Sequence, residues 1–308
     1  MKKDLAIAVD LGASNLRVAL ISKNGKILKY LRTETPKTGN SGTIITKTLI
    51  VLINALLEGQ SKKQIAGIGI SSIGPLDHKS EKILDSPNIP FKEIPLTKPL
   101  KKYFFFPIYL SNDCTAAVWG EKIFGAGRKY ENLVYVTISS GIGGGAIVDN
   151  HLLCGHNGNV AEVGHFIVDT KYNLLCGCKK GYGHWEGYCS GNNLPRFFRY
   201  WLKYNKIKKK CPVKTAKDIF DLARKADKVV LKFLEEIGQI NARGISNIII
   251  AYSPEIISIG GAVFLNNKEF ILPYIKKNID KYLTAPKIIT TPLGEDITLF
   301  GAAALVFF

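Results

Sequence analysis

Residues 4–22, DLAIAVDLGASNLRVALIS, set the pattern from which the rest of the chain is interpreted. Apolar residues dominate 4–10 and 16–22 and predict two strands, separated by a tight turn over 11–15. A hairpin signal, Asn24-Gly25, then precedes a third predicted strand over 26–33. The stretch therefore predicts a meander of three strands whose first turn consists mainly of small residues.

Asp10 ends the first predicted strand, directly before this turn. A carboxylate at this position can hold water around magnesium. Small turn residues let backbone N–H groups approach a phosphate closely. The turn residues in question are Gly12, Ala13, Ser14 and Asn15. An ordinary hairpin turn without a ligand is an equally good interpretation of these residues alone.

The same pattern returns at 132–149, NLVYVTISSGIGGGAIVD. A strand over 132–138, a small-residue turn over 139–145 and a strand over 146–149 are predicted. Two such hairpins suggest a duplicated domain with two phosphate-binding turns; the candidates in the second turn are Ser140, Gly141 and Gly143. A later strand over 255–259 ends at Gly260-Gly261, where small residues would let a flat ring such as adenine approach the backbone.

The elements around these hairpins alternate between helix and strand. Strands are expected at 64–71, 107–110 and 287–290, and helices at 43–57, 114–124, 193–204, 215–224, 226–251, 269–282 and 297–307. This order fits two α/β domains flanking a cleft. The expected domains are residues 1–112, completed by the helix at about 296–308, and residues 113–295.

Ser111-Asn112-Asp113 follows a predicted strand and opens a predicted helix. The N-terminus of a helix is a polar, partly positive site, and the Asp113 carboxylate there can accept a proton from a sugar hydroxyl. Capping of the helix by Asp113 is the competing interpretation. Loops that leave strand ends in open α/β sheets bind ligands, and two such loops contain Gly74 and Asn88.

Residues 158–191 combine two kinds of chemistry. His165, Cys176, Cys178 and His184 form a thiolate and imidazole set that suits tetrahedral zinc. The carboxylates of Glu162 and Glu186 lie two or three residues from these candidate ligands and suit a polyhydroxy ligand. A zinc-stapled loop without any ligand is the alternative.

The composition of this chain of 308 residues is that of a globular, cytoplasmic protein. Its hydrophobic content of 46% is enough for full cores, and no apolar run reaches the length of a membrane span. The start, MKKDLAIAVDLG, does not resemble a signal peptide, and in the cytosol the six cysteines are expected to be reduced. Most of the lysines behind the net charge of +17 are scattered. They indicate a solvated surface that favours an anionic substrate rather than a nucleic-acid site.

In this order, the motifs resemble those of the ROK family of sugar kinases (repressors, open reading frames, kinases) in the actin-like ATPase superfamily. Residues 10–15 and 140–145 resemble its two phosphate loops, D-x-G-G-T-K and T-G-I-G-G-G. The other matching segments are 72–77 and 87–89 near the sugar, Asn112-Asp113 with the catalytic base, 161–165 (G-E-x-G-H), 176–186 (the zinc segment) and 259–262 (the adenosine motif).

This sequence departs from the family pattern at several positions. Ala13, Ser14 and Asn15 replace Gly, Thr and Lys in the first loop. Ala161 replaces the Gly before the signature Glu, and Ser139 replaces a Gly in the second loop. The zinc segment is one residue longer than usual, and His184 lies about where the last Cys belongs. Cys189 is the alternative ligand if His184 points away.

The resemblance implies ATP-dependent transfer of a phosphoryl group to the 6-hydroxyl of a hexose, with glucose as the first expectation. Asp113 would be the base, and Asp10 would hold magnesium through water. The sugar ligands would be Gly74, Asn88, Asn112, Asp113, Glu162, His165 and Glu186. N-acetylmannosamine, N-acetylglucosamine or fructose as substrate, polyphosphate as donor, and a non-catalytic sugar sensor are the alternatives. A sugar-responsive repressor is disfavoured because the chain begins three residues before its first predicted strand. A homodimer or homotetramer, with neither nucleic-acid nor membrane partners, is expected.

Overall fold

The computed structural model describes residues 3–77, 79–86, 89–208 and 213–308. The chain divides into two compact units. Unit 1 comprises residues 1–130, 150–160 and 296–308, and unit 2 comprises residues 131–149 and 161–295. Helix α3 (Asp113–Ile123) packs along α10 (Ile297–Phe307) and belongs to unit 1, whereas the predicted boundary lies before this helix.

Unit 1 is built on a five-stranded sheet with the order β3-β2-β1-β4-β8. The first three strands pair antiparallel as predicted, and β1, β4 and β8 run parallel. The strands are β1 (Leu5–Leu11), β2 (Asn15–Ser22), β3 (Ile27–Glu34), β4 (Ile65–Ser72) and β8 (Ile108–Asn112).

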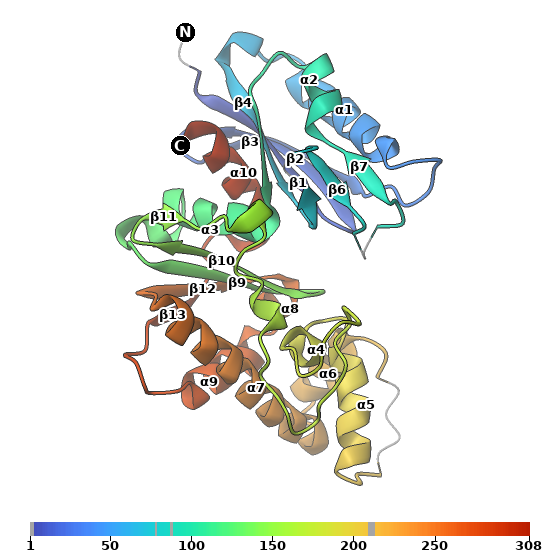
Figure 1. Cartoon of the computed structure of the whole chain (residues 1–308), viewed down its shortest axis with the longest axis vertical. Coiled ribbons are helices and arrows are strands. Elements are labelled where there is room, and N and C mark those ends of the chain that lie inside the picture. The colour runs from blue at the N-terminus through green and yellow to red at the C-terminus, as the bar shows by residue number, and fades with distance from the viewer. Residues whose placement is uncertain (1–2, 78, 87–88, 209–212) are drawn as a thin grey trace. The chain divides into compact units, whose positions relative to one another are not determined.

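Both faces of β1 are buried, because helices cover the sheet on each side (Figure 1). Ile7 and Val9 belong to a core formed with α1 (Thr43–Leu57) and α2 (Thr97–Tyr103). Alternate strand residues face opposite sides, and Ala6 and Ala8 accordingly pack against α10. The small side chains on that face let α10 lie close to the sheet. Gly301 brings α10 so near to α3 that an added Cβ would be 2.0 Å from the Ala116 carbonyl oxygen.

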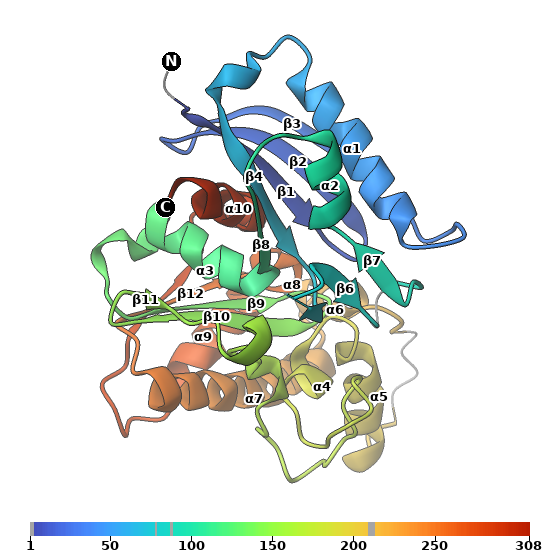
Figure 2. The same ribbon diagram turned by 45° about the horizontal axis from the view of Figure 1, so that its top comes forward.

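Unit 2 repeats this strand pattern. Its own strands lie in the order β10-β9-β12-β13 within a five-stranded sheet, with β9 and β10 antiparallel and β9, β12 and β13 parallel. The strands are β9 (Leu133–Ile138), β10 (Ile142–Val148), β12 (Ile256–Gly260) and β13 (Lys287–Thr290). The long helix α7 (Lys228–Tyr252) runs beside α9 (Lys268–Asn278) (Figure 2). The shorter helices are α4 (Glu186–Cys189), α5 (Leu194–Tyr204), α6 (Ala216–Arg224) and α8 (Ala262–Leu265).

The structure corrects several element predictions. The second glycine-rich turn is short, because β10 already begins at Ile142. The helix predicted over 269–282 ends at Asn278. The region of the two predicted loops that contain Gly74 and Asn88 also contains three short strands, β5 (Leu76–Asp77), β6 (Lys82–Leu84) and β7 (Glu93–Pro95), which were not predicted. A short β11 (His151–Leu152) was not predicted either. None of the helices in the described ranges is long and apolar enough to cross a membrane.

Candidate active site and metal centre

The register of the unit 1 sheet brings several candidate residues to one edge. Asp10 pairs with Ser71 across β1 and β4, and Ser72 pairs with Asn112 across β4 and β8. Because these strands are parallel, their carboxyl ends meet at that edge. Gly74 lies there too, since an added Cβ would be 3.7 Å from Asn112 Nδ2. Asn88 lies outside the described residues.

The first hairpin turn is held in place by hydrogen bonds from Thr35, the residue that follows β3. The Gly12 N–H donates to the Asn15 carbonyl at 3.0 Å, which closes the turn containing Ala13 and Ser14. Thr35 donates from Oγ1 to the Gly12 carbonyl at 2.7 Å and from its N–H to the Ser14 carbonyl at 3.0 Å. The Asn15 side chain, where the family has Lys, accepts two hydrogen bonds from the Arg32 guanidinium, at 3.1 and 2.9 Å.

Asp10 forms an ion pair that was not predicted from the sequence. Arg17 Nε donates to Asp10 Oδ2 at 2.8 Å, and its other nitrogens reach Asp296 Oδ1 at 3.2 Å and Thr298 Oγ1 at 3.0 Å. Burial raises the pKa of the Asp10 carboxyl, and the Arg17 charge opposes that shift. The sequence contained a signal for this ion pair, because a hairpin that pairs Leu11 with Leu16 must place Arg17 opposite Asp10.

The N-terminus of α3 presents Asn112 and Asp113. Asn112 is the N-cap: its Oδ1 accepts the N–H groups of Cys114 and Thr115 at 2.9 and 3.4 Å. Asp113 is the first helical residue, and its Oδ1 also accepts the Cys114 N–H, at 2.8 Å. The interpretation of Asp113 as the N-cap is therefore wrong. A carboxylate in the first helical turn is stabilised by the helix dipole.

The second hairpin and the Gly260-Gly261 turn lie side by side in unit 2. β12 runs parallel to β9 and pairs Gly260 with Thr137, so both turns leave the same edge of the sheet. Gly261 has φ +87°, and an added Cβ would be 2.5 Å from Thr137 Oγ1. No larger residue fits there without displacement. Ser140 and Gly141 lie in the hairpin turn, whereas Gly143 lies in β10.

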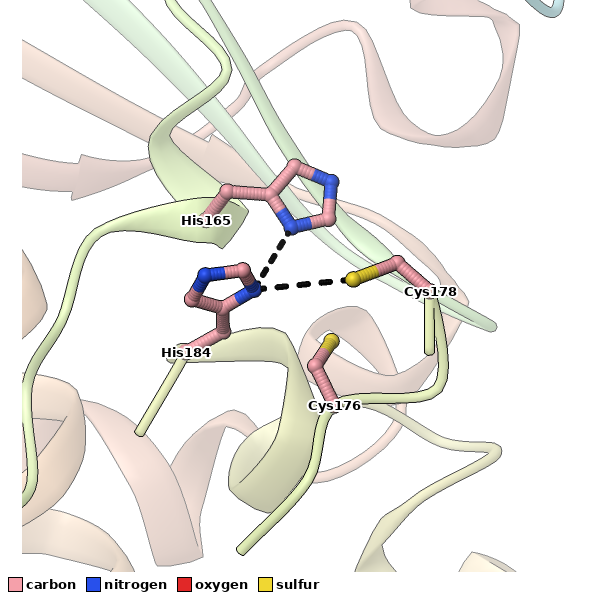
Figure 3. Close-up of side chains that lie close together, drawn as sticks. All are labelled: His165, Cys176, Cys178 and His184. Carbon is pink, nitrogen blue, oxygen red and sulfur yellow. Dashed lines mark hydrogen bonds between the residues drawn. The ribbon is translucent and has the colours of Figure 1, made fainter. Parts of the chain in front are cut away.

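The four candidate metal ligands converge on one point (Figure 3). Ligand atoms of His165, Cys176, Cys178 and His184 all lie within 4.8 Å of one another. His184 Nδ1 is 3.2 Å from His165 Nδ1 and 3.6 Å from Cys178 Sγ. Ligands of a tetrahedral zinc ion lie roughly 3.3–3.8 Å apart, given bonds of about 2.0–2.3 Å. The arrangement therefore fits a tetrahedral metal ion.

Cys189 is not part of this cluster. It is buried, and its thiol lies 3.9 Å from the Ile237 carbonyl oxygen, which accepts its hydrogen bond. The alternative of Cys189 as the fourth ligand is wrong in this structure. Burial lowers the pKa of His184, which favours the neutral imidazole that a metal requires. Burial also raises the pKa of Cys176 to about 11; metal binding would have to displace that proton.

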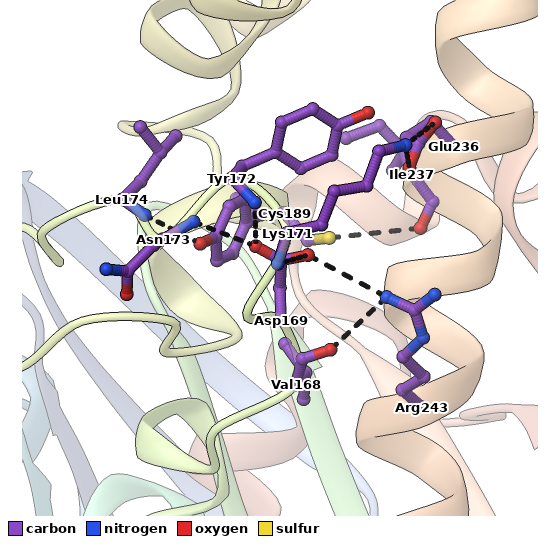
Figure 4. Close-up of polar contacts among 11 residues, drawn as sticks. Val168, Asp169, Lys171, Tyr172, Asn173, Leu174, Cys189, Glu236, Ile237 and Arg243 are labelled. Atoms are coloured by element: carbon purple, nitrogen blue, oxygen red, sulfur yellow. Dashed lines mark hydrogen bonds and ion pairs between the residues drawn. The ribbon is translucent and has the colours of Figure 1, made fainter.

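A buried carboxylate supports the loop that leads to Cys176 and Cys178 (Figure 4). Asp169 accepts the backbone N–H groups of Tyr172 at 2.9 Å and Asn173 at 3.2 Å, and lies 3.9 Å from Arg243 Nη1 of α7. Asp169 was not among the predicted site residues. Its main partners are backbone groups, which leave no spacing signal in a sequence.

The two carboxylates near the cluster lie in different surroundings. Glu162 is exposed, with Oε2 4.0 Å from His165 Nε2, while Nδ1 of the same ring faces the cluster. Glu186 is half-buried, and its Oε2 accepts the N–H of Ile142 at 2.9 Å. A metal-bound His165 would therefore keep its second nitrogen on the Glu162 side.

The candidate residues thus form two sets, one in each unit. Unit 1 collects Asp10, residues 12–15, Gly74, Asn112 and Asp113 at one sheet edge. Unit 2 collects the second hairpin, Gly260-Gly261, the two carboxylates and the metal cluster.

Comparison with known proteins gives consistent matches over the whole chain. The sequence model of the ROK family matches residues 6–307. A glucokinase of Pyrobaculum calidifontis is 34% identical over 98% of this chain and 94% of its own. A ROK hexokinase from Thermus thermophilus superposes with a TM-score of 0.82 at 26% identity, covering 98% and 97% of the two chains. A ROK glucokinase from Streptomyces griseus in complex with glucose and AMPPNP gives 0.78 at 27% identity, with 98% of both chains covered. These likenesses and the repeated sheet confirm the predicted actin-like α/β fold.

Proposed function

The chain belongs to the ROK family, and we propose that it is an ATP-dependent glucokinase that transfers the γ-phosphoryl group of ATP to the 6-hydroxyl of glucose. The relatives called glucokinases and the glucokinase solved with glucose and AMPPNP support this assignment. The observation that carries it is the grouping, in unit 2, of a short hairpin turn with Glu162, His165 and Glu186.

The proposed hexose site consists of hydrogen-bonding groups on rigid supports. Glu162 and Glu186 would accept hydrogen bonds from sugar hydroxyl groups, and His165 would contact the sugar through Nε2. Gly74, Asn88 and Asn112 are the proposed contacts from unit 1. N-acetylmannosamine, N-acetylglucosamine and fructose are the competing substrates, because an acetyl group or an altered ring changes the pocket mainly through loop shape.

The proposed nucleotide site uses backbone more than side chains. Residues 12–15 and Ser140, Gly141 and Gly143 would surround the phosphates of Mg-ATP, and Gly260-Gly261 would face the adenosine. Backbone N–H groups in such turns stabilise the charge that develops on the transferred group. Asp10 would hold magnesium through water, oriented by its 2.8 Å contact with Arg17. Polyphosphate is the competing donor.

Asp113 is the proposed base. Phosphoryl transfer passes through a loose transition state, so the base chiefly orients the attacking hydroxyl and accepts its proton late. Its position in the first turn of α3 favours the ionised carboxylate that this role requires.

The proposed metal at His165, Cys176, Cys178 and His184 is zinc. Two imidazoles and two thiolates are a common structural zinc set. When bound, zinc would fix the orientation of His165, and the remaining chemistry would belong to the protein side chains. A homodimer or homotetramer in the cytoplasm stays our prediction.

The test is ADP release with Mg-ATP against glucose, mannose, fructose, glucosamine, N-acetylglucosamine and N-acetylmannosamine. We expect the highest kcat/KM with glucose. Asp113→Asn should lower kcat by at least about 10²-fold while glucose binding stays within about twofold, and the exposed Asp4→Asn serves as control. An active Asp113→Asn enzyme would exclude Asp113 as base. Absence of turnover with every sugar would favour polyphosphate or a sugar sensor.

A further inference from the structure

We propose that Glu186 is a positioning residue for the nucleotide: its hydrogen bond to the Ile142 N–H fixes the second hairpin in the shape that receives the phosphates. This inference rests on the proposed function and extends it. Glu186 would then serve both substrates, the hexose through its exposed side and the nucleotide through the hairpin.

Ile142 is held on both sides by the segments that carry the metal cluster. Its N–H donates to Glu186 Oε2 at 2.9 Å, and Glu186 follows the cluster residue His184 by two positions. Its carbonyl oxygen lies against Gly164, where an added Cβ would be only 2.1 Å away. Gly164 directly precedes the cluster residue His165. Both cluster-bearing segments therefore contact the first residue of β10.

The rest of the hairpin turn is tied to the residues after Glu186. The Gly191 N–H donates to the Ser139 carbonyl at 2.8 Å, and the Asn192 N–H donates to the Ser140 carbonyl at 3.2 Å. Inside the turn, the Ser139 N–H donates to the Gly141 carbonyl at 2.9 Å. Gly141 also approaches Glu186 closely, since an added Cβ would be 2.6 Å from Oε2. The turn thus takes its shape from residues 186–192.

The negative charge of Glu186 and its hydrogen bond to Ile142 should have opposite effects on nucleotide affinity. A carboxylate beside a phosphate-binding turn repels the phosphates, so loss of the charge alone would strengthen nucleotide binding. Loss of the hydrogen bond would release the turn and weaken binding, because a disordered turn must be ordered again by the ligand. The sign of the change therefore separates a positioning role from a role confined to the sugar.

The experiment is calorimetric titration of the zinc-loaded protein with Mg-AMPPNP in the absence of sugar. We expect Glu186→Ala to raise Kd about five- to tenfold, as for one lost positioned hydrogen bond. Glu186→Gln keeps an acceptor without the charge and should stay within about twofold of wild type or bind more tightly. Glu235→Ala, which removes an exposed carboxylate on α7 of the same unit, is the control and should not change Kd.

Nucleotide binding by Glu186→Ala that equals or exceeds that of wild type would overturn the inference. If Glu186→Ala does not fold, Glu186→Asp takes its place, because it keeps the charge on a side chain too short to reach Ile142. It should bind nucleotide more weakly than Glu186→Gln, and equal binding would also overturn the proposal. If the wild-type protein phosphorylates glucose in the same experiment, such a result would refute only the role of Glu186 and not the proposed function. Wild-type protein that binds no nucleotide would refute both.

Discussion

The two hairpins β1–β2 and β9–β10 begin sheets with the same strand directions, yet different forces hold them in place. The first hairpin is held by side-chain charge, through Arg17 between Asp10 and Asp296. The second is held by close backbone packing at Gly164 and by the hydrogen bond from Ile142 to Glu186. A duplicated strand pattern therefore does not imply duplicated stabilisation.

The difference follows from what lies next to each hairpin. In unit 1 the neighbours are Asp296, which directly precedes α10, and Thr298 in its first turn, and both offer oxygen atoms to a guanidinium. In unit 2 the neighbours are the segments that carry His165 and His184, whose own geometry depends on the cluster. We therefore expect changes of charge and pH to affect the first hairpin, and changes of side-chain volume and metal binding to affect the second.

The largest expected effect comes from added volume beneath the second hairpin. Gly164→Ala would place a Cβ 2.1 Å from the Ile142 carbonyl oxygen, a backbone atom that cannot move alone. We expect a loss of about 3 kcal/mol in the free energy of unfolding, as for severe overpacking. Urea unfolding followed by circular dichroism measures it.

Gly187→Ala is the control for that variant. Its nearest atom would be Cys176 Cα at 3.4 Å, an ordinary contact distance, and it lies in α4 of the same segment. We expect a change of less than about 1 kcal/mol. Equal losses for both variants would mean that the close approach at Ile142 does not determine stability there.

Charge removal at the first hairpin should have the next largest effect. Arg17→Ala leaves the Asp10 carboxylate buried without its guanidinium, since the two side chains are only 14% and 9% exposed. We expect a loss of about 2–3 kcal/mol in the free energy of unfolding, somewhat below the range for fully buried pairs. Arg32→Ala, which removes an exposed guanidinium from Asn15, should cost less than about 1 kcal/mol.

The same variant has a pH signature. The Arg17 charge lowers the pKa of Asp10 against the rise caused by burial. Without Arg17 that pKa rises further, so Asp10 becomes protonated at higher pH and would lose the magnesium-bound water that we propose it holds. The acid limb of kcat/KM should therefore move to higher pH in Arg17→Ala and stay in place in Arg32→Ala. If the acid limb of kcat/KM stays in place in both variants, protonation of Asp10 does not cause the loss of activity at low pH.

Metal content should depend on His184 and not on Cys189. His184→Ala removes one of four converging ligands, and we expect zinc affinity to fall by at least about 10²-fold. Cys189→Ser removes a thiol that donates to Ile237 and should leave the zinc content of the purified protein unchanged. Atomic emission spectrometry after dialysis measures both. Zinc retained by His184→Ala and lost by Cys189→Ser would reverse our assignment of the fourth ligand.

Sequence patterns predicted the elements whose signal is local. The helix over 43–57, the strand over 287–290 and the helix over 297–307 have the predicted bounds, because apolar periodicity and flanking breakers define them. The four candidate zinc ligands also converge as predicted. The elements within residues 76–103 were not predicted, because short strands among prolines and polar residues show little periodicity. The role of Asp169 depends on backbone N–H groups, which no spacing reveals.

The smallest effect concerns Ala161, which replaces the family glycine before Glu162. Its φ is +54°, a left-handed conformation that costs an alanine about 1 kcal/mol or more relative to glycine. Ala161→Gly removes this strain but adds freedom to the unfolded chain, which offsets about 0.4–1 kcal/mol. We expect a net gain of roughly 0.5 kcal/mol in the free energy of unfolding.

Ala226→Gly is matched to it, because Ala226 has φ +57° on an exposed turn away from the cluster segments. Both variants should gain similar stability, and Ala161→Gly alone should also raise the KM for glucose, about twofold to threefold, because Glu162 would lose a rigid neighbour. Unchanged KM in both variants would mean that the strain at Ala161 has no part in orienting Glu162. A raised KM only in Ala161→Gly would mean that this chain uses a strained alanine to hold its hexose carboxylate in place.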